Sequence, residues 1–177
     1  MTERLLAPLG QLVEQFTKDS VAPDDDARKQ LGEELAKLFR VQPDEVAILG
    51  ITSGGNFLQF ILPKELRAIG TIPINSTSAL AARTARERKA DAMNNFSVVR
   101  HASVFEGVPL GRSRGEMIQK IMSAPILDGD KVVGVVQISR KGTSTADAGP
   151  DFTPHDLRQL IALSTPLSRF VRACQES

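Results

Sequence analysis

The chain has 177 residues, enough for one domain with a buried core. Its 22 basic and 21 acidic residues nearly cancel, so the chain as a whole has no strong attraction to nucleic acid or to an anionic membrane. The single cysteine excludes an intramolecular disulfide framework and a metal site built from several cysteines. The first residues do not form a convincing signal peptide, and no apolar run is long enough to span a bilayer. We expect a cytoplasmic protein without nucleic-acid or membrane partners.

Two helices are predicted ahead of the first strand. The first spans residues 3–17, where apolar residues recur every three or four positions. The second follows Pro23, carries three aspartates at its positive N-terminal end, and ends near Arg40, before Pro43. We interpret residues 1–24 as an N-terminal helical extension whose apolar stripe needs a partner.

Three strands and a helix are predicted next. Residues 44–51 and 57–62 are rich in apolar, β-branched and aromatic residues, and the five residues between them contain two glycines, which favours a hairpin turn. Paired glycines also bind phosphate groups, but that arrangement requires a helix directly after them, and a strand is predicted here. Residues 69–74 predict a third short strand. A helix with small residues on one face and basic residues on the other then runs from about Ser78 to Lys89.

The longest predicted hairpin joins residues 117–127 to residues 131–139 through an Asp-Gly-Asp turn. Strict alternation in the second strand predicts one wholly apolar face, made of Val132, Gly134, Val136 and Ile138. Because Gly134 has no side chain, a helix or a ligand is expected to approach the backbone closely on that face. Pro125 cannot donate a backbone hydrogen bond, which predicts a sheet edge or a bulge on its side of the first strand.

The predicted C-terminal helix begins at a capping sequence, Thr153 to Asp156. Its apolar residues recur every three or four positions and occupy more than one side, so one side is expected to cover the sheet. The other side then needs a second helix, from residues 3–17 or from a second subunit. Pro166 is predicted to kink or bend this helix. We expect a homodimer whose interface is made by Leu5, Leu9, Leu12, Phe16, Leu160, Leu167 and Val171.

Taken together, these features resemble the GAF domain family. A proline and a short acidic turn precede the strand pattern V-x-G-V-x-Q-x-S at residues 132–139, and F-T-P-H-D-L at residues 152–157 opens the last helix. Upstream, the residues Ile72 to Ile74 and Asn94 to Phe96 look like the family's third strand and its pocket-covering segment. The resemblance covers about residues 28–174.

This resemblance implies an α+β, GAF/PAS-like fold. Its expected elements are a central antiparallel sheet of about five to six strands, helices packed on one face, and long N- and C-terminal helices. Residues 25–177 would form the GAF domain itself. GAF domains share this scaffold and differ in what they bind, so the ligand does not follow from the fold.

The segment from Ala90 to Glu116 lacks a regular period and mixes apolar with polar side chains. In GAF domains the corresponding segment closes over the pocket, so the resemblance implies a non-catalytic regulatory domain that senses a small molecule. Residues 78–120 carry eight basic and four acidic residues, a net charge of +4, which suits an anionic ligand or an acidic protein partner. The candidate ligand contacts are Thr77, Arg83, Asn94, Asn95, His101 and Gln119.

The sequence offers little support for a metal site, for catalysis or for cyclic-nucleotide binding. His101 is able to bind a metal or to act as a general base, but the second histidine, His155, belongs to a helix cap, so we predict no metal, no cofactor and no catalytic residue. The family's free methionine sulfoxide reductases need cysteines in the pocket region, and this chain has none there. The Asn-Lys pair of its cyclic-nucleotide-binding members is also absent. The alternative to a sensor is an interaction or dimerisation scaffold with a filled pocket.

Overall fold

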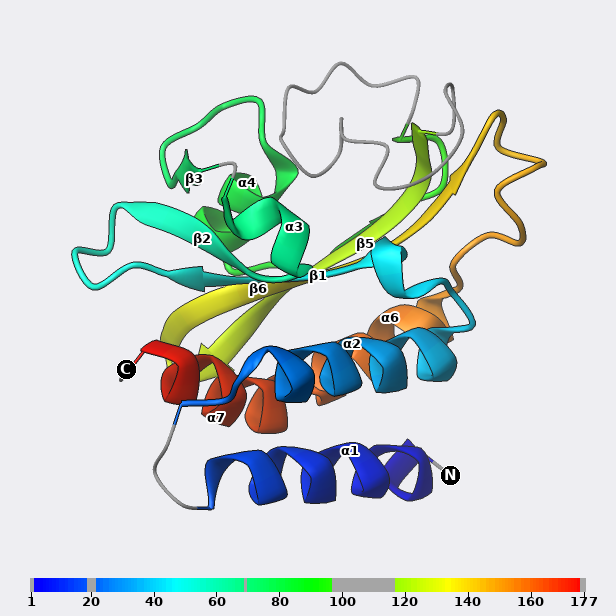
Figure 1. Ribbon diagram of the computed structural model, residues 1–177. Helices are drawn as coiled ribbons and strands as arrows, with labels where there is room; N and C mark the ends of the chain where they lie inside the picture. The colour runs from blue at the N-terminus through cyan, green and yellow to red at the C-terminus, as the bar shows by residue number, and fades with distance from the viewer. Residues whose placement is uncertain (1, 19–21, 69, 97–116, 176–177) are drawn as a thin grey trace.

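The computed structural model describes residues 2–18, 22–68, 70–96 and 117–175, with side chains from residue 7 onward. Within these residues, six strands form one antiparallel sheet in the order β3-β2-β1-β6-β5-β4 (Figure 1). The strands are β1 Val46–Ile51, β2 Phe57–Leu62, β3 Thr71–Pro73, β4 Asp91–Met93, β5 Met117–Asp128 and β6 Lys131–Gly142. The predicted α+β class with a central antiparallel sheet is confirmed.

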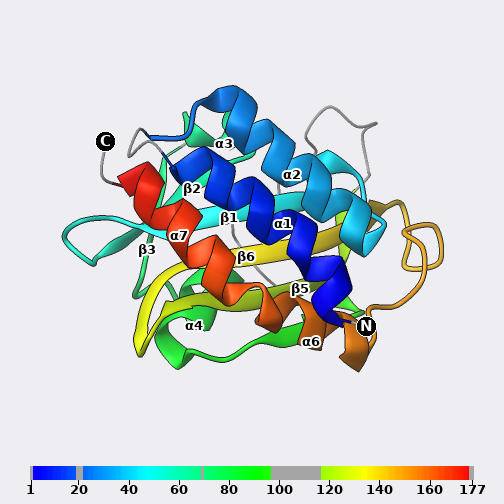
Figure 2. The same cartoon turned by 90° about the horizontal axis from the view of Figure 1, so that it is seen from below.

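Helices cover both faces of the sheet. The helices are α1 Thr2–Thr17, α2 Asp25–Phe39, α3 Lys64–Arg67, α4 Leu80–Glu87, α6 Pro154–Ala162 and α7 Ser164–Gln175, with a 3₁₀ turn, η1, at Pro43–Glu45. Helices α2, α6 and α7 lie on one face, which we call the helical face, and α1 packs outside them (Figures 1 and 2). Helices α3 and α4 lie on the opposite face, the α4 face. No helix in the described ranges is long and apolar enough to cross a membrane.

Two of the helices begin at the positions that the sequence predicted. The side chain of Asp24 accepts a hydrogen bond of 2.8 Å from the backbone N–H of Ala27. Thr153 and Asp156 form a reciprocal capping box at the start of α6. Because each of these contacts joins residues only three positions apart, the sequence was sufficient to predict where the two helices begin.

The C-terminal helix is broken into two helices, whereas a single kinked helix was predicted. Pro166 has no N–H, and its ring opposes the carbonyl group four residues earlier, at Ala162. Helix α6 ends at that residue, and α7 begins at Ser164. The hydroxyl of Ser164 then accepts a hydrogen bond of 2.7 Å from the N–H of Leu127 in β5, which ties the break to the sheet.

A separate hydrophobic core lies on each face of the sheet. The helical-face core contains fully buried side chains from α2, β1 and α7, among them Leu31, Leu35, Ile48, Leu167 and Phe170. The α4-face core contains Leu49, Leu58, Ile121, Val135 and small residues of α4. The small side chains of Ala81, Ala82 and Ala85 let α4 approach the sheet closely, as its composition predicts.

The β5–β6 hairpin contains a bulge that strict alternation did not predict. Ile126 pairs with Gly134, but Leu127 pairs with Val132, so Val133 is an extra residue in β6. Val133 therefore joins the helical-face core, while Val132 packs against the α4-face core. The prediction that Val132 shares a face with Val136 and Ile138 is wrong, because the extra residue in the bulge reverses the alternation of side chains at this point.

Gly134 is needed for a close contact between strands. A Cβ atom at this position would lie 2.3 Å from the backbone oxygen of Leu49 in β1. The expectation that a helix or a ligand approaches here is therefore wrong, since the neighbouring strand fills the space. Pro125 does lie at an edge, because β4 pairs with β5 only from Ile121 to Ser123 among the described strands.

Candidate functional site

The structure describes five of the six predicted ligand contacts and does not gather them into one site. Thr77 and Asn95 are exposed, and Arg83 forms ion pairs with Asp91 at 3.2 Å and with Glu87 at 3.9 Å. The amide of Gln119 is buried and donates to the backbone oxygen of Gly142 at 2.8 Å. His101 lies outside the described residues.

Asn94 joins two distant parts of the chain. Its Oδ1 accepts a hydrogen bond of 2.8 Å from the N–H of Phe152, and its Nδ2 donates one of 3.1 Å to the oxygen of the same residue. Phe152 is buried directly before the α6 cap. These two bonds give Asn94 a structural role, because they hold the loop before α6 against the end of β4.

We expect Asn94→Ala to lower the free energy of unfolding by about 1–3 kcal/mol, since two partly buried backbone groups lose their partner. Chemical denaturation followed by circular dichroism measures the change. The matched control is Asn95→Ala, because Asn95 is the exposed neighbour. Equal stabilities of the two variants would contradict the structural role of Asn94.

The predicted dimer residues lie mainly inside a single chain. Helix α1 packs against α7 and α2 of its own chain. Four of the seven residues are fully or almost fully buried there: Leu9, Leu160, Leu167 and Val171. Leu12 and Phe16 are half-buried, and the side chain of Leu5 is outside the described part. A dimer built through the four buried residues would require α1 to leave its own α7, so the homodimer stays a prediction.

A chain of buried polar side chains crosses the α4 face. It consists of Thr84 on α4, Ser123 on β5 and Gln137 on β6, each at most 2% exposed. The hydroxyl of Thr84 donates to the backbone oxygen of Leu80 at 3.0 Å and lies 2.7 Å from the hydroxyl of Ser123. Ser123 therefore donates to Thr84, and it accepts from Nε2 of Gln137 at 3.2 Å.

The end of this chain lacks a partner. Oε1 of Gln137 is buried and accepts no hydrogen bond from any residue that the structure describes. An orphaned buried acceptor costs about 1–3 kcal/mol, so such groups in folded proteins call for a specific explanation. The sequence contained a signal for this residue, since Gln137 interrupts an apolar strand on the face opposite to the terminal helices, but the candidate contacts did not include it.

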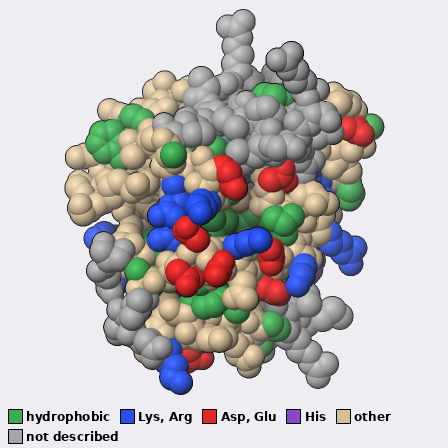
Figure 3. Space-filling view, in the orientation of Figure 1, with side chains coloured by type: hydrophobic (Ala, Val, Ile, Leu, Met, Phe, Trp, Pro, Cys, Tyr) green, Lys and Arg blue, Asp and Glu red, His purple; other side chains and the backbone are tan. Residues whose placement is uncertain are grey.

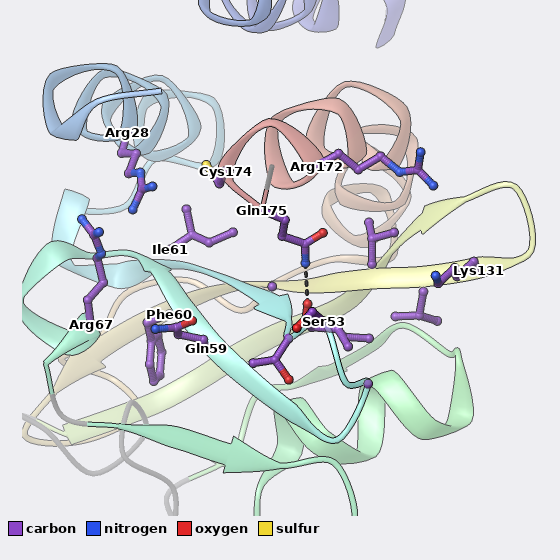
Figure 4. A pocket seen from close by; sticks show the side chains of 16 residues that line it. Arg28, Ser53, Gln59, Phe60, Ile61, Arg67, Lys131, Arg172, Cys174 and Gln175 are labelled. Carbon is purple, nitrogen blue, oxygen red and sulfur yellow. Dashed lines mark hydrogen bonds between the residues drawn. The ribbon is translucent and has the colours of Figure 1, made fainter. Parts of the chain in front are cut away.

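A second polar site, the cationic pocket, opens beside the C-terminal end of α7 (Figure 4). Its volume is about 670 Å³. It is formed by α2, the β1–β2 hairpin, the end of α3, the start of β6 and the end of α7. The basic side chains that line it are Arg28, Arg67, Lys131 and Arg172, and the described lining contains no Asp or Glu. Each of the four comes from a different element, so no sequence motif pointed to this pocket.

Two of these cations are held by carboxylates outside the pocket lining. Arg67 binds Asp25 at 2.7 Å, and Arg172 forms an ion pair with Asp128. The hydrogen bond from Lys64 is the largest effect on the pKa of Asp25. Together with the charge of Lys64 and the hydrogen bond and charge of Arg67, it holds this pKa below its usual range against the opposing effect of burial. The two ion pairs orient the arginines at the rim of the pocket.

The single cysteine, Cys174, lines the same pocket. Burial raises the pKa of its thiol, and the nearby guanidinium of Arg28 offsets part of that shift. The side chain packs against the helical-face core, on the opposite face of the sheet from Gln137. A thiol with a raised pKa is a weak nucleophile at neutral pH, which agrees with a packing role.

A third feature is a groove of about 510 Å³ between α2 and α3. Acidic and basic side chains mix over these two helices, as the space-filling view shows (Figure 3). Asp25, Lys64 and Glu65 are among the residues that line the groove. Charges of both signs neutralise one another here, so the groove favours no class of charged ligand.

Comparisons with known proteins agree with this architecture. The family model described as "GAF domain" matches residues 26–169, which is most of the chain. No curated protein matches the sequence.

Solved structures of similar fold include the GAF domain of an Acinetobacter phosphoenolpyruvate-protein phosphotransferase, with 17% identity, 99% of this chain and 97% of that chain covered, and a TM-score of 0.68. The corresponding GAF domain from Coxiella burnetii shares 11% identity, with 95% of each chain covered and a TM-score of 0.63. The free methionine-R-sulfoxide reductase of Neisseria meningitidis, in complex with its substrate, shares 15% identity over 95% of this chain and 88% of that chain, with a TM-score of 0.60. At these identities the likeness concerns the fold alone. The family match over residues 26–169, together with the six-stranded sheet, shows that the chain belongs to the GAF domain family.

Proposed function

We propose that this chain is a non-catalytic regulatory GAF domain that senses a small ligand on the α4 face of its sheet. GAF domains are generally regulatory or sensory, and the finer assignment rests on Gln137. Its buried Oε1 has no partner among the described residues and requires a hydrogen-bond donor, which a ligand N–H or O–H group would supply. Thr84 and Ser123 fix the orientation of the Gln137 amide through the hydrogen-bonded chain. The acceptor is therefore held in place before any ligand arrives.

The position of the cysteine supports the non-catalytic part of the proposal. Relatives of similar fold include reductases of methionine sulfoxide, a chemistry for which the family uses cysteines near the pocket. Cys174 lies on the helical face and has a raised thiol pKa. It is therefore separated by the sheet from the polar chain that ends at Gln137.

The sheet offers a direct path from the α4 face to the terminal helices. Ser123 and Gln137 are paired across β5 and β6. Their sequence neighbours Met122 and Val136 point to the opposite face and lie in the helical-face core. A ligand that shifts this strand pair would change the packing beneath α7, and in our proposal a partner protein or a second copy reads that change at the helices.

We expect Gln137→Leu to raise the free energy of unfolding of the ligand-free protein by about 1 kcal/mol, because removing the orphaned acceptor outweighs the loss of one hydrogen bond to Ser123. For a chain of this size the midpoint of thermal unfolding rises by about 2–4 °C. The control is Gln30→Leu at an exposed position of α2, where no gain is expected.

Native mass spectrometry of wild type and Gln137→Leu, purified in parallel, tests the ligand itself. We expect the wild type to retain a small molecule that leaves on denaturation, and the variant to be bare. A bare wild type together with a Gln137→Leu variant that is less stable would contradict the sensor. That outcome would favour the alternative, a scaffold whose interior is filled by its own side chains.

A further inference from the structure

We propose that the cationic pocket binds a small phosphate-bearing polyanion, at a site separate from the ligand site on the α4 face. The proposal does not depend on the sensor function, because the pocket lining contains none of Thr84, Ser123 and Gln137, the residues of the polar chain. Three observations carry it: the unbalanced charge of the pocket, the buried donor of Arg28, and the size of the space.

The positive charges that line the pocket are not neutralised by acidic residues of the lining. Of its four cations, Arg67 and Arg172 have carboxylate partners, whereas neither Arg28 nor Lys131 forms an ion pair with any residue that the structure describes. The partner carboxylates, Asp25 and Asp128, stand outside the lining. A space lined by basic side chains from several helices and strands attracts an anion with more than one charge.

Arg28 offers a donor that the protein leaves unused. Its Nε is buried and has no hydrogen-bond partner within the described part of the chain, although the residue as a whole is partly exposed and lines the pocket. Arg28 from α2 and Arg67 from α3 point toward one another across the pocket (Figure 4). A guanidinium donates two parallel hydrogen bonds, and phosphate oxygens match that geometry. A phosphate group between the two arginines would accept hydrogen bonds from both guanidinium groups.

The space suits a small molecule rather than a single ion. A volume of about 670 Å³ falls within the range of ligand pockets, about 300–1,000 Å³. Neutral polar side chains add directional contacts, since Ser53, Gln59 and Gln175 face the same space (Figure 4). The amide of Gln175 already donates to the backbone oxygen of Ile51, which fixes the end of α7 beside the hairpin. A bound polyanion would thus bridge α2, α3 and α7 to the sheet.

Isothermal titration calorimetry of the full chain with pyrophosphate tests this site. We expect one binding event per chain for the wild type, and an affinity at least about tenfold weaker for Arg28→Gln, because a charge-assisted hydrogen-bonding group is removed. The matched control is Arg169→Gln, which removes an exposed arginine from α7 outside the pocket and should leave the affinity unchanged. Lys131→Gln, at an exposed position of the β5–β6 hairpin, is a second pocket variant if Arg28→Gln fails to fold.

Cys174 provides an internal reporter of where the anion binds. It is the single cysteine of the chain and it lines the pocket, so a thiol reagent modifies this residue alone. We expect saturating pyrophosphate to slow the reaction of Cys174 several-fold in the wild type and to have no effect in Arg28→Gln.

Four outcomes would overturn the proposal. The first is no binding heat with pyrophosphate. The second is an equal loss of affinity in Arg169→Gln, which would indicate non-specific attraction. The third is binding without protection of Cys174, which would place the anion elsewhere. The fourth is citrate binding as tightly as pyrophosphate, which would refute the preference for phosphate.

Discussion

Gly134→Ala should destabilise the protein more than a Gly→Ala substitution at any other glycine of the described sheet. A Cβ atom at this position would meet the backbone oxygen of Leu49 at 2.3 Å, far inside van der Waals contact. Both residues belong to the central strands β1 and β6, which are paired on both sides, so neither backbone can move away without loss of hydrogen bonds. We expect the free energy of unfolding to fall by about 3 kcal/mol, the upper part of the usual range for overpacking.

Chemical denaturation of wild type and Gly134→Ala measures this loss. The control is Gly10→Ala in α1, where an added Cβ meets nothing within 4 Å and helix propensity favours alanine by about 1 kcal/mol. The two variants add the same methyl group and should move the midpoint in opposite directions. An unchanged midpoint for Gly134→Ala would contradict the close contact between Gly134 and the backbone of Leu49.

Val13→Asp should separate α1 from the rest of the domain. Val13 has no exposed surface and belongs to the helical-face core, where α1 meets α7 and α2. An aspartate at this position either stays buried as an unpaired charge or forces the helix into solvent, and both outcomes are costly. We expect the free energy of unfolding to fall by about 3–5 kcal/mol. Gln15→Asp introduces the same charge at an exposed position of the same helix and should change stability by less than about 0.5 kcal/mol.

The same experiment tests whether α1 packs on its own chain. If it does, the denaturation midpoint of the wild type is independent of protein concentration. In a dimer that exchanges α1 between subunits, the midpoint rises with concentration, because unfolding is then coupled to dissociation. A concentration-dependent midpoint that Val13→Asp abolishes would contradict the packing of α1 within one chain and would support the predicted homodimer.

The two candidate sites differ in how closely their residues follow the family pattern of the sequence. The polar chain on the α4 face depends on residues in the V-x-G-V-x-Q-x-S strand and on α4, all within the region that resembles the GAF family. The cationic pocket depends on Arg28 and on Arg172, which lie near the two ends of that region, and on the rims of two hairpins. A fold shared by many proteins thus carries a second site that its family pattern does not specify.

Local patterns in the sequence determined most of the elements. Apolar spacing of three and four predicted α1, α2 and the C-terminal helices, and short-range caps fixed the starts of α2 and α6. Glycine-containing turns predicted both long hairpins. These signals act between residues a few positions apart, so a single sequence contains them in full. The short α3 and β4 were missed, since elements of three or four residues lack a period to detect.

Only the tertiary structure decided which side chains meet. Thr84 and Gln137 lie 53 positions apart in the sequence, and whether the acceptor of Gln137 finds a partner depends on α4 and β5 together. The bulge at Val133 also depends on register with β5, and because of it Val132 and Val136, which strict alternation would place on one face, belong to opposite cores. The sequence by itself therefore determined the family and the order of elements, because periodicity and caps are local. The orphaned acceptor, the packing of α1 and the cationic pocket required the structure, because each arises where distant segments come into contact.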